Sequence, residues 1–358
     1  MPFFCPVPLA EPVVSSGLTG PIPSAGPYYT ESIEGPRTVL RRNPNYHGTR
    51  PRRAERIVYT DNIPALQAVS LADSGEVEYL PMDFDSYSPL APGGQLDRRY
   101  GAKSAAARNG TQRYHLAPFP VVDMVVFNTR RPLFRDLQLR RAVNYALDRP
   151  ALAAVRGEPP ADHYIPPAVP GYRDRHVYPI DGPDLQIARR LAGRRNRRAV
   201  LSFCGDPANR RVAQIVRSNL RRIRIAVLIV ESQDCFGGHD PRADNADLLL
   251  SGFGTPERDP APFLEEALAT AAYGSPLGPG PWNDPAARRR IVRARSLRGE
   301  ARLASYARLD NQLVRNAVPF AVYGSQVHPD YFSPRVGCKL FQAAYHFVDL
   351  GALCLRGR

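Results

Sequence analysis

The pattern of apolar and polar residues between Met124 and Arg149 predicts a buried strand followed by an amphipathic helix. Met124 to Phe127 form a short apolar run of strand-forming residues, typical of a strand buried on both faces. Pro132 ends this part, and from Asp136 onward apolar residues recur at three- and four-residue spacing with arginines between them. Asp136 is a candidate cap for that helix. On the pattern alone, this is an ordinary βα unit of an α/β protein.

Similar patterns continue along the chain. They predict helices at 136–148, 184–193, 208–222, 260–271, 284–297 and 299–316, and strands at 200–203, 225–231 and 246–250. This alternation predicts an α/β sheet flanked by helices. The segment from Tyr87 to Arg113 has few large apolar residues and much Gly, Ala and Arg, so we expect an exposed, mobile loop there.

Composition and charge set the class of protein. The 358 residues are 43% apolar, which is ordinary for a globular chain with room for two domains. The formal charge of +14 suggests nucleic acid or an anionic membrane surface as a partner. However, the basic residues are 46 arginines and two lysines, a skew that indicates a GC-rich coding sequence. Because no aromatic interleaving accompanies the clusters at 194–198 and 288–290, we interpret them as solvated surfaces and expect no nucleic-acid partner.

Catalytic and metal-binding patterns are missing from the sequence. It has no G-x-S-x-G, no G-x-x-x-x-G-K-[ST] and no H-E-x-x-H motif, and its seven histidines lack metal-ligand spacing. Six aspartates could in principle pair as acid and base, but such pairs are common by chance: Asp184, Asp206, Asp234, Asp240, Asp244 and Asp247. We therefore expect no enzyme, no catalytic residue, no metal and no cofactor.

Several segments, in order along nearly the whole chain, resemble the extracellular solute-binding proteins of family 5, which serve ABC importers of peptides, nickel and some sugars. They are Gly26-Pro27-Tyr28 with residues 40–48, residues 65–78, the segment 123–149, Tyr164-Ile165-Pro166-Pro167 with residues 170–179, residues 246–250, Asp259-Pro260, Trp282-Asn283-Asp284-Pro285 and Val318-Pro319-Phe320. None of them is a catalytic motif.

The resemblance implies an α/β fold of the two-lobed, periplasmic-binding-protein-like (type II) kind. Residues 1–120 and 318–358 would form lobe I, and residues 121–317 lobe II. The predicted hinge comprises Phe127, Asn128, Val318 and Tyr323. Residues 1–36 hold eight prolines and no recognisable signal peptide. By comparison with the family, on the order of the first third of a full-length member is absent, so we expect lobe I to be incomplete.

The implied function is that of the substrate-binding component of an ABC importer. Such a protein captures a peptide or similar small solute in an interlobe cleft and delivers it to a membrane permease. We expect a monomer outside the cytoplasm. One alternative is a truncated, non-functional remnant of such a protein, and a less favoured one is a basic nucleic-acid-binding module.

The ligand site departs from the family pattern. Peptide-binding members commonly hold the ligand's amino group with an aspartate just after the strand at 246–250, where this chain has Gly252 and Phe253. The arginine that some members use for the ligand's carboxylate falls near Phe203. We therefore predict a site for a more apolar or uncharged ligand, lined by Asn128, Phe203, Gly252 and Phe253. The alternative, that both phenylalanines belong to the core, stays open.

The five cysteines bear on the compartment. They stand at positions 5, 204, 235, 338 and 354, without C-x-x-C spacing. Cys204 and Cys235 follow two predicted strands that would be adjacent and parallel, and Cys338 and Cys354 bracket a short C-terminal excursion. Disulfides 204/235 and 338/354 would fit an extracytoplasmic protein, although free buried thiols remain an alternative.

Overall fold

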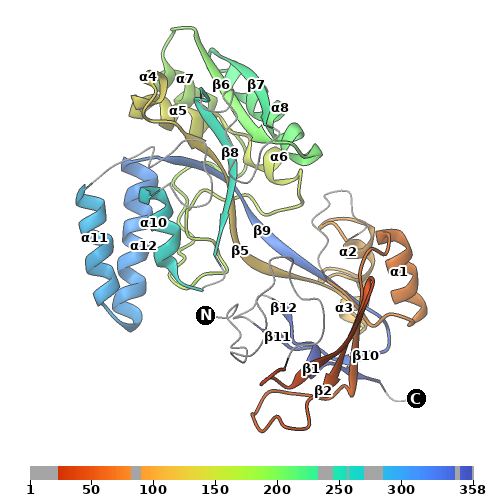
Figure 1. Ribbon diagram of the computed structural model, residues 1–358. Coiled ribbons are helices and arrows are strands. Elements are labelled where there is room, and N and C mark those ends of the chain that lie inside the picture. Colours follow the sequence, from red (N-terminus) through yellow and green to blue (C-terminus); the bar gives the residue numbers. More distant parts are fainter. Residues whose placement is uncertain are drawn as a thin grey trace. The chain divides into compact units, whose positions relative to one another are not determined.

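The computed structural model describes residues 23–81, 90–232, 245–255, 258–269, 285–342 and 347–356 (Figure 1). The chain divides into two compact units. Unit 1 comprises Met1–Ala117 and His328–Arg358, and unit 2 comprises Pro118–Val327. Two long strands, β5 (Tyr114–Phe127) and β9 (Phe320–Phe332), contribute residues to both units. Among the described helices, none combines the length and the apolar character that a membrane span requires.

Unit 2 is built on a mixed sheet with the strand order β9-β5-β8-β6-β7. Strand β6 (Arg197–Cys204) is parallel to β7 (Ile225–Ser232), as the sequence predicts, and also to β8 (Leu248–Gly254), which is antiparallel to β5. The helices of this unit are α4 (Pro132–Arg135), α5 (Leu137–Ala146), α6 (Arg149–Ala153), α7 (Leu185–Ala192), α8 (Pro207–Arg221), α10 (Pro260–Ala269), α11 (Pro285–Ser296) and α12 (Gly299–Asn316).

Strand β5 contributes to two hydrophobic cores. Successive side chains of a strand point to opposite faces of the sheet. Val125 and Phe127 belong to a buried cluster with α5, α7 and α8, whereas Val122, Met124 and Val126 belong to a second one with α10, α11 and α12. Helices α10, α11 and α12 pack side by side over the second cluster (Figure 1). The predicted burial of this strand on both faces is confirmed.

Each of the helices α5, α6, α7 and α8 in unit 2 begins directly after an aspartate. The carboxylate of each aspartate accepts a hydrogen bond from a backbone N–H in the first turn, which satisfies a donor that the helix itself leaves unpaired. The capped N–H groups belong to Gln138, Ala151, Ile187 and Ala208, at 2.8, 3.1, 2.9 and 2.6 Å from Asp136, Asp148, Asp184 and Asp206 respectively. The predicted cap at Asp136 is therefore confirmed, and the predicted helix starts at 136, 184 and 208 lie close to the observed ones.

The side chain of Arg149 is fully buried, at 0% exposed, and bonds to three separate parts of unit 2. Its guanidinium donates to the side-chain oxygen of Asn144 at 2.9 Å and to the carbonyls of Ala161 at 3.1 Å and Val322 at 2.9 Å. It thus ties α5, the segment after α6 and strand β9 together. Burial lowers the pKa of Arg149 to about 10, so the side chain is still a cation at neutral pH.

Unit 1 contains a small antiparallel sheet in the order β1-β2-β3. Gly35, with φ +56°, makes the turn of the hairpin between β1 and β2. The elements of this unit are β1 (Tyr28–Glu34), β2 (Arg37–Arg42), β3 (Arg56–Thr60), α1 (Ala65–Ser74), β4 (Tyr79–Leu80), α2 (Gln95–Tyr100), α3 (Ala105–Arg108), β10 (Val336–Cys338), β11 (Phe341–Gln342), β12 (Phe347–Val348), the 3₁₀ helix η1 (Leu350–Ala352) and β13 (Cys354–Leu355).

The prediction of an exposed, mobile loop between Tyr87 and Arg113 is wrong for residues 90–113. Residues 87–89 lie outside the described part of the chain. Helices α2 and α3 occupy this segment. Leu90 and Leu96 are buried with Tyr331, and the hydroxyl of Tyr114 donates to the carbonyl of Leu90 at 2.7 Å. The segment has few large apolar residues, but two of them, Leu90 and Leu96, belong to the hydrophobic core of unit 1.

A disulfide joins Cys338 of β10 to Cys354 of β13, within unit 1. These are the cysteines that the sequence predicts to pair across the C-terminal excursion. Cys235, the predicted partner of Cys204, lies outside the described residues, as does Cys5. The pairing of Cys204 with Cys235 therefore stays a prediction.

Candidate functional site

Asp123 and Glu158 form a buried carboxyl pair in unit 2. Asp123 lies within the apolar strand β5 and is 5% exposed; Glu158 follows α6 and is 9% exposed. Taking a carboxylate out of water is costly unless a charge or hydrogen bonds compensate it. Buried titratable pairs of this kind are candidates for functional sites as well as for structural ion-pair networks.

The oxygens of this pair are only partly satisfied. Oδ1 of Asp123 accepts a hydrogen bond from Nε2 of Gln326 at 3.0 Å, and Oδ2 lies 3.8 Å from Nε of Arg156. Arg156 is shared with Asp206, whose Oδ2 lies 3.0 Å from its Nη2. Within the described part of the chain, Oδ2 of Asp123 and Oε2 of Glu158 find no hydrogen-bond donor as long as both groups are ionised.

A shared proton resolves this deficit. Burial raises the pKa of Glu158 well above its ordinary value, and the neighbouring charge and hydrogen bond of Asp123 raise this pKa further. A protonated Glu158 becomes a donor and supplies the hydrogen bond that Asp123 accepts. Burial also raises the pKa of Asp123, and the charge of Arg156 opposes the shift of both carboxyl groups.

Two glycines make room for the pair. A Cβ atom at Gly252 would lie 2.6 Å from Oδ1 of Asp123, and one at Gly324 would collide with Oε2 of Glu158. The backbone of residues 158–161 also runs along β9, with an isolated bridge between Pro160 and Gly324. The carboxyl groups thus lie directly against the backbone of β8 and β9, where any side chain would displace them.

Asp123 and its partner Gln326 stand on the two strands that lead out of unit 2. Asp123 is on β5 and Gln326 on β9, and the chain passes between the units at Ala117–Pro118 and Val327–His328. Tyr323 of β9 lies in the same electrostatic environment, because burial first, then the charges of Asp123 and Glu158, raise the pKa of its phenol.

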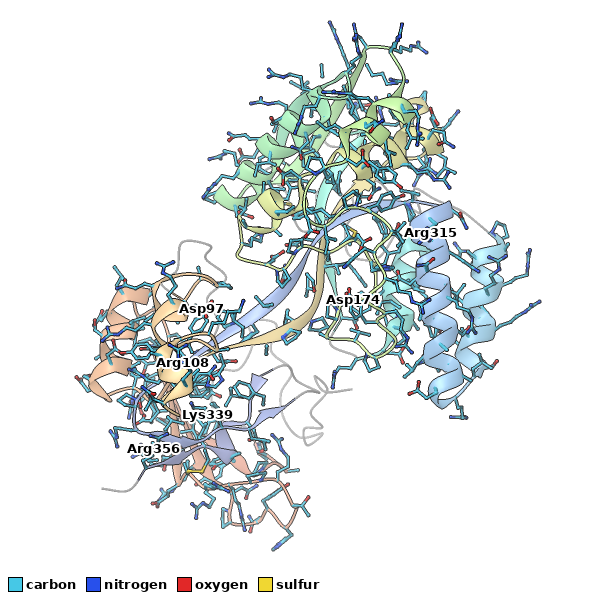
Figure 2. The ribbon with its side chains drawn as sticks, turned by 180° about the vertical axis from the view of Figure 1, so that it is seen from behind. Asp97, Arg108, Asp174, Arg315, Lys339 and Arg356 are labelled. Atoms are coloured by element: carbon cyan, nitrogen blue, oxygen red, sulfur yellow. A yellow bond between two sulfur atoms is a disulfide. The ribbon has the colours of Figure 1, made fainter. Side chains whose placement is uncertain are left out.

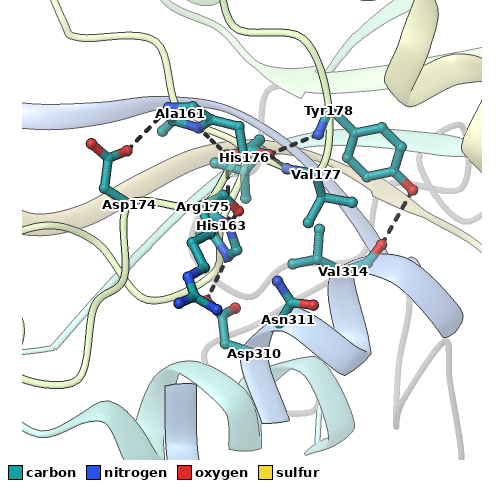
Figure 3. Close-up of polar contacts among 12 residues, drawn as sticks. Ala161, His163, Asp174, Arg175, His176, Val177, Tyr178, Asp310, Asn311 and Val314 are labelled. Atoms are coloured by element: carbon teal, nitrogen blue, oxygen red, sulfur yellow. Dashed lines mark hydrogen bonds and ion pairs between the residues drawn. The ribbon is translucent and has the colours of Figure 1, made fainter. Parts of the chain in front are cut away.

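A second polar cluster of unit 2 is centred on His163 (Figure 3). Its Nδ1 donates to Oδ2 of Asp310 on α12 at 2.8 Å, and its Nε2 donates to the carbonyl of Arg175 at 2.7 Å. Both ring nitrogens can donate at once only in the imidazolium form. Burial by itself lowers the pKa of His163, but the hydrogen bond and charge of Asp310 outweigh burial and raise it to about 9.

Asp162 extends this cluster along the chain. Its Oδ2 accepts hydrogen bonds from the backbone N–H groups of Val177 at 2.6 Å and Tyr178 at 2.9 Å, and its Oδ1 lies 3.0 Å from Nδ1 of His176. These contacts fix the backbone of the segment 172–178 against residues 162–163. Across the described residues, no group of three or more His, Cys, Asp or Glu is arranged to hold a metal ion.

The four residues predicted to contact a ligand lie in different environments. Phe203 is 1% exposed within the core of unit 2, which is the alternative that the sequence left open. Asn128 is buried as well, and its Nδ2 donates to the carbonyl of Ala246 at 3.0 Å. Phe253 is half-buried with its ring centroid 5.4 Å from that of Phe263.

Gly252 is the predicted ligand residue that adjoins the carboxyl pair, because it lies opposite Asp123 in the register of β5 and β8. The aspartate that the family pattern led us to look for after residue 250 is absent from that strand. The carboxylate of Asp123, on the neighbouring strand β5, fills the space beside Gly252.

The predicted hinge residues Phe127, Asn128, Val318 and Tyr323 all lie inside unit 2, whereas the chain crosses between the units at Ala117–Pro118 and Val327–His328. Val318 has φ +51°, which is uncommon for a β-branched residue. Its N–H donates to the carbonyl of Leu313 at 2.8 Å and its carbonyl accepts from Arg140 at 3.1 Å, so tertiary contacts hold this conformation.

The sequence did not single out the carboxyl pair. Of the aspartates considered as acid or base, Asp184 and Asp206 cap helices and Asp247 pairs with Arg131 at 2.6 Å; Asp234, Asp240 and Asp244 lie outside the described residues. The signal for Asp123 was its place inside an otherwise apolar strand. Glu158 carried no comparable signal.

The chain is similar in sequence to one protein family and in fold to many solved structures. The family model described as bacterial extracellular solute-binding proteins, family 5 Middle, matches residues 7–275. Among curated protein sequences, nothing matches. Many solved structures do, and these share the fold.

Three solved structures illustrate the likeness. A clavulanic acid biosynthesis oligopeptide binding protein 2 has a TM-score of 0.73 at 21% identity, with 93% of this chain and 63% of that chain covered. NikA from Brucella suis, in complex with Fe(III)-EDTA, has a TM-score of 0.70 at 19% identity, covering 93% and 68%. An ABC transporter substrate-binding protein from Sinorhizobium meliloti has a TM-score of 0.69 at 20% identity, covering 96% and 71%.

These matches identify the mixed α/β fold as that of two-lobed solute-binding proteins, as predicted. The chain spans about two thirds of the length of these three structures, between 63% and 71%.

Proposed function

The chain belongs to the bacterial extracellular solute-binding proteins of family 5, and from this we propose that it is the substrate-binding component of an ABC importer. Members of the family are extracytoplasmic, bind peptides or small molecules, work with ABC permeases and are in general not enzymes. The observation that carries the proposal is the family match over residues 7–275. On this proposal the chain acts outside the cytoplasm, as a monomer and without catalysis.

The proposed cycle is capture and delivery. A peptide or similar small solute binds in the interlobe cleft that family membership implies, with residues 1–120 and 318–358 as lobe I and 121–317 as lobe II. Ligand binding shifts the population toward a closed form, which hands the solute to a membrane permease. The proposed hinge is formed by residues in or beside β5 and β9, namely Phe127, Asn128, Val318 and Tyr323.

The proposed ligand contacts are Phe253, Gly252 and the polar groups beside them. Phe253 offers apolar ring surface, and the half-buried side chains of Arg156 and Gln326 offer hydrogen-bonding groups, whereas the Asp123–Glu158 pair is itself buried. Asn128 and Phe203 are buried, so on this proposal they support the ligand site without touching the ligand. Such a combination favours a ligand that is largely apolar or uncharged and carries at least one polar group.

Thermal unfolding of the 358-residue protein tests the proposal. It is measured alone and with pooled short peptides and sugars, because a ligand that binds only the folded state raises the midpoint. A cooperative transition that one pool raises supports the proposal, and fractionating that pool identifies the solute. If every pool leaves a cooperative transition unmoved, the alternative of a chain that no longer binds solute replaces it.

Two variants then locate the site for the identified solute. Phe253→Asp and Gln326→Ala alter the proposed contacts, and Glu300→Gln alters an exposed carboxylate on α12 as the matched control. We expect at least about tenfold weaker binding for either site variant, equivalent to about 1.4 kcal/mol, and unchanged binding for the control. Unchanged affinity in Phe253→Asp would remove Phe253 from the site.

A further inference from the structure

Four arginines converge on one hollow of unit 2. The hollow, which we call the arginine groove, has a volume of about 470 Å³ and lies between α12 and the segment 173–175. It is lined by Arg173, Arg175, Arg308 and Arg315, together with His163, Ala304, Ala307, Asp310, Asn311 and Gln312. Figure 2 labels Arg315 on α12 and Asp174 on the segment of the other wall.

One wall of the groove is a single face of α12. Ala304, Arg308, Asn311 and Arg315 follow one another at four-, three- and four-residue spacing, which places them on one side of a helix. The methyl side chain of Ala304 leaves the space that the longer side chains surround. Nε of Arg315 donates to Oδ1 of Asn311 at 2.8 Å, which orients this guanidinium along the helix face.

The other wall is held in place by the buried cluster of Figure 3. The carbonyl of Arg175 accepts from His163, and the N–H of Arg175 donates to the carbonyl of Arg173 at 2.9 Å. Asp162 fixes the following residues through the N–H groups of Val177 and Tyr178. The backbone that carries Arg173 and Arg175 is therefore ordered before any ligand arrives, which lowers the entropic cost of binding.

The groove has an excess of positive charge. In the described part of the chain, no carboxylate oxygen lies within 4.0 Å of the guanidinium nitrogens of the four arginines. The two nearby carboxylates are engaged elsewhere, since Asp310 pairs with His163 at 2.8 Å and Asp174 with His176 at 3.1 Å. By contrast, Arg156 on the carboxyl-pair side of unit 2 lies 3.0 Å from Asp206.

We propose that the arginine groove binds the phosphate groups of an anionic ligand. A guanidinium presents a planar fork of donors that matches the oxygens of a phosphate, and several forks on one concave wall can bind more than one phosphate. The volume is in the range of small-molecule sites. This site lies wholly within unit 2 and does not depend on the solute-binding function proposed above.

Titration calorimetry of the full-length protein with pyrophosphate tests this proposal. The site variant is R175Q/R308Q, because neither guanidinium makes a hydrogen bond, ion pair or cation–π contact within the described residues that its loss would disturb. The control is R190Q/R217Q, which removes the same charge from exposed positions on α7 and α8. Circular dichroism and thermal unfolding of all three proteins establish that they are folded alike.

We expect pyrophosphate to bind the wild-type protein and the control with equal affinity, and R175Q/R308Q at least about tenfold more weakly. Binding should weaken as sodium chloride is added, because the attraction is between charges. A second arm uses vesicles of phosphatidylcholine with and without phosphatidylglycerol. Binding of the anionic vesicles alone, lost in R175Q/R308Q, identifies a lipid headgroup as the source of the phosphate.

Two results would overturn the proposal. The first is that neither pyrophosphate nor anionic vesicles bind the wild-type protein. The second is that R175Q/R308Q binds them as well as R190Q/R217Q does, which would mean that net charge and not the groove is responsible. In either case the four arginines form a solvated face.

Discussion

Asp123 lies directly opposite Gly252 in the antiparallel pair of β5 and β8, and the missing side chain of Gly252 leaves the space that the Asp123 carboxylate occupies. A carboxyl group inside an apolar strand is thereby accommodated without displacing its neighbours. In the same way, the missing side chain of Gly324 leaves the space that the Glu158 carboxyl group occupies. Both carboxyl groups of the pair thus depend on a glycine in an adjacent strand.

Gly252→Ala should destabilise the protein by about 1 to 3 kcal/mol, because its methyl group would lie too close to Oδ1 of the buried Asp123. Urea unfolding measures the change. The same substitution in an Asp123→Ala background should cost less than half as much, since the colliding carboxylate is gone. Equal costs in both backgrounds would contradict the steric dependence.

Glu158→Gln should make the protein less sensitive to rising pH. The pKa of Glu158 is raised on folding, so its contribution to stability is present below its ordinary pKa of 4.5 and is lost as pH rises through the folded value. Glutamine keeps a donor for Asp123 and cannot ionise. We expect the variant to exceed the wild type in unfolding free energy by about 1 kcal/mol or more at the alkaline end of a titration.

The control for this experiment is Glu300→Gln on the exposed side of α12, which should leave the pH profile unchanged. A constant difference between wild type and Glu158→Gln from acid to alkaline pH would mean that Glu158 does not change its protonation state in this range.

His163→Gln should remove a different pH dependence. The pKa of His163 rises from 6.5 to about 9 on folding, so its stabilisation is fully present below pH 6.5 and is lost as pH rises through about 9. The variant should lose up to about 3 kcal/mol of unfolding free energy below pH 6.5, and the gap should close above pH 9. Chemical unfolding at several pH values measures it, with the exposed His47→Gln as control. A gap independent of pH would refute the charged His163–Asp310 pair.

Arg149→Met should destabilise unit 2 by about 3 to 5 kcal/mol, because it leaves several buried carbonyls without a donor. Arg190→Met, on the exposed face of α7, is the matched control and should change stability by less than about 0.5 kcal/mol. Thermal unfolding distinguishes them. A loss no larger than the control's would show that water replaces the lost donors.

The local elements of unit 2 could be predicted because their signals are local. Asp136, Asp184 and Asp206 cap helices through bonds to residues two or three positions away, and the apolar periodicity of α5 and α8 needs no knowledge of distant residues. The order of motifs along the chain predicted the family, and the match over residues 7–275 bears that out. The segment 90–113 was mistaken because its core contacts are made with β9, far along the chain.

By itself, the sequence determined the family, the α/β class and the elements of unit 2, since these follow from spacing within short windows and from the order of motifs. Only the tertiary structure decided which charged groups meet. Asp123 and Glu158 are brought together by β5 and by a segment that runs along β9, and the arginine groove joins residues 173–175 to α12. Contacts between residues so far apart depend on how the strands and helices pack, which no local pattern encodes.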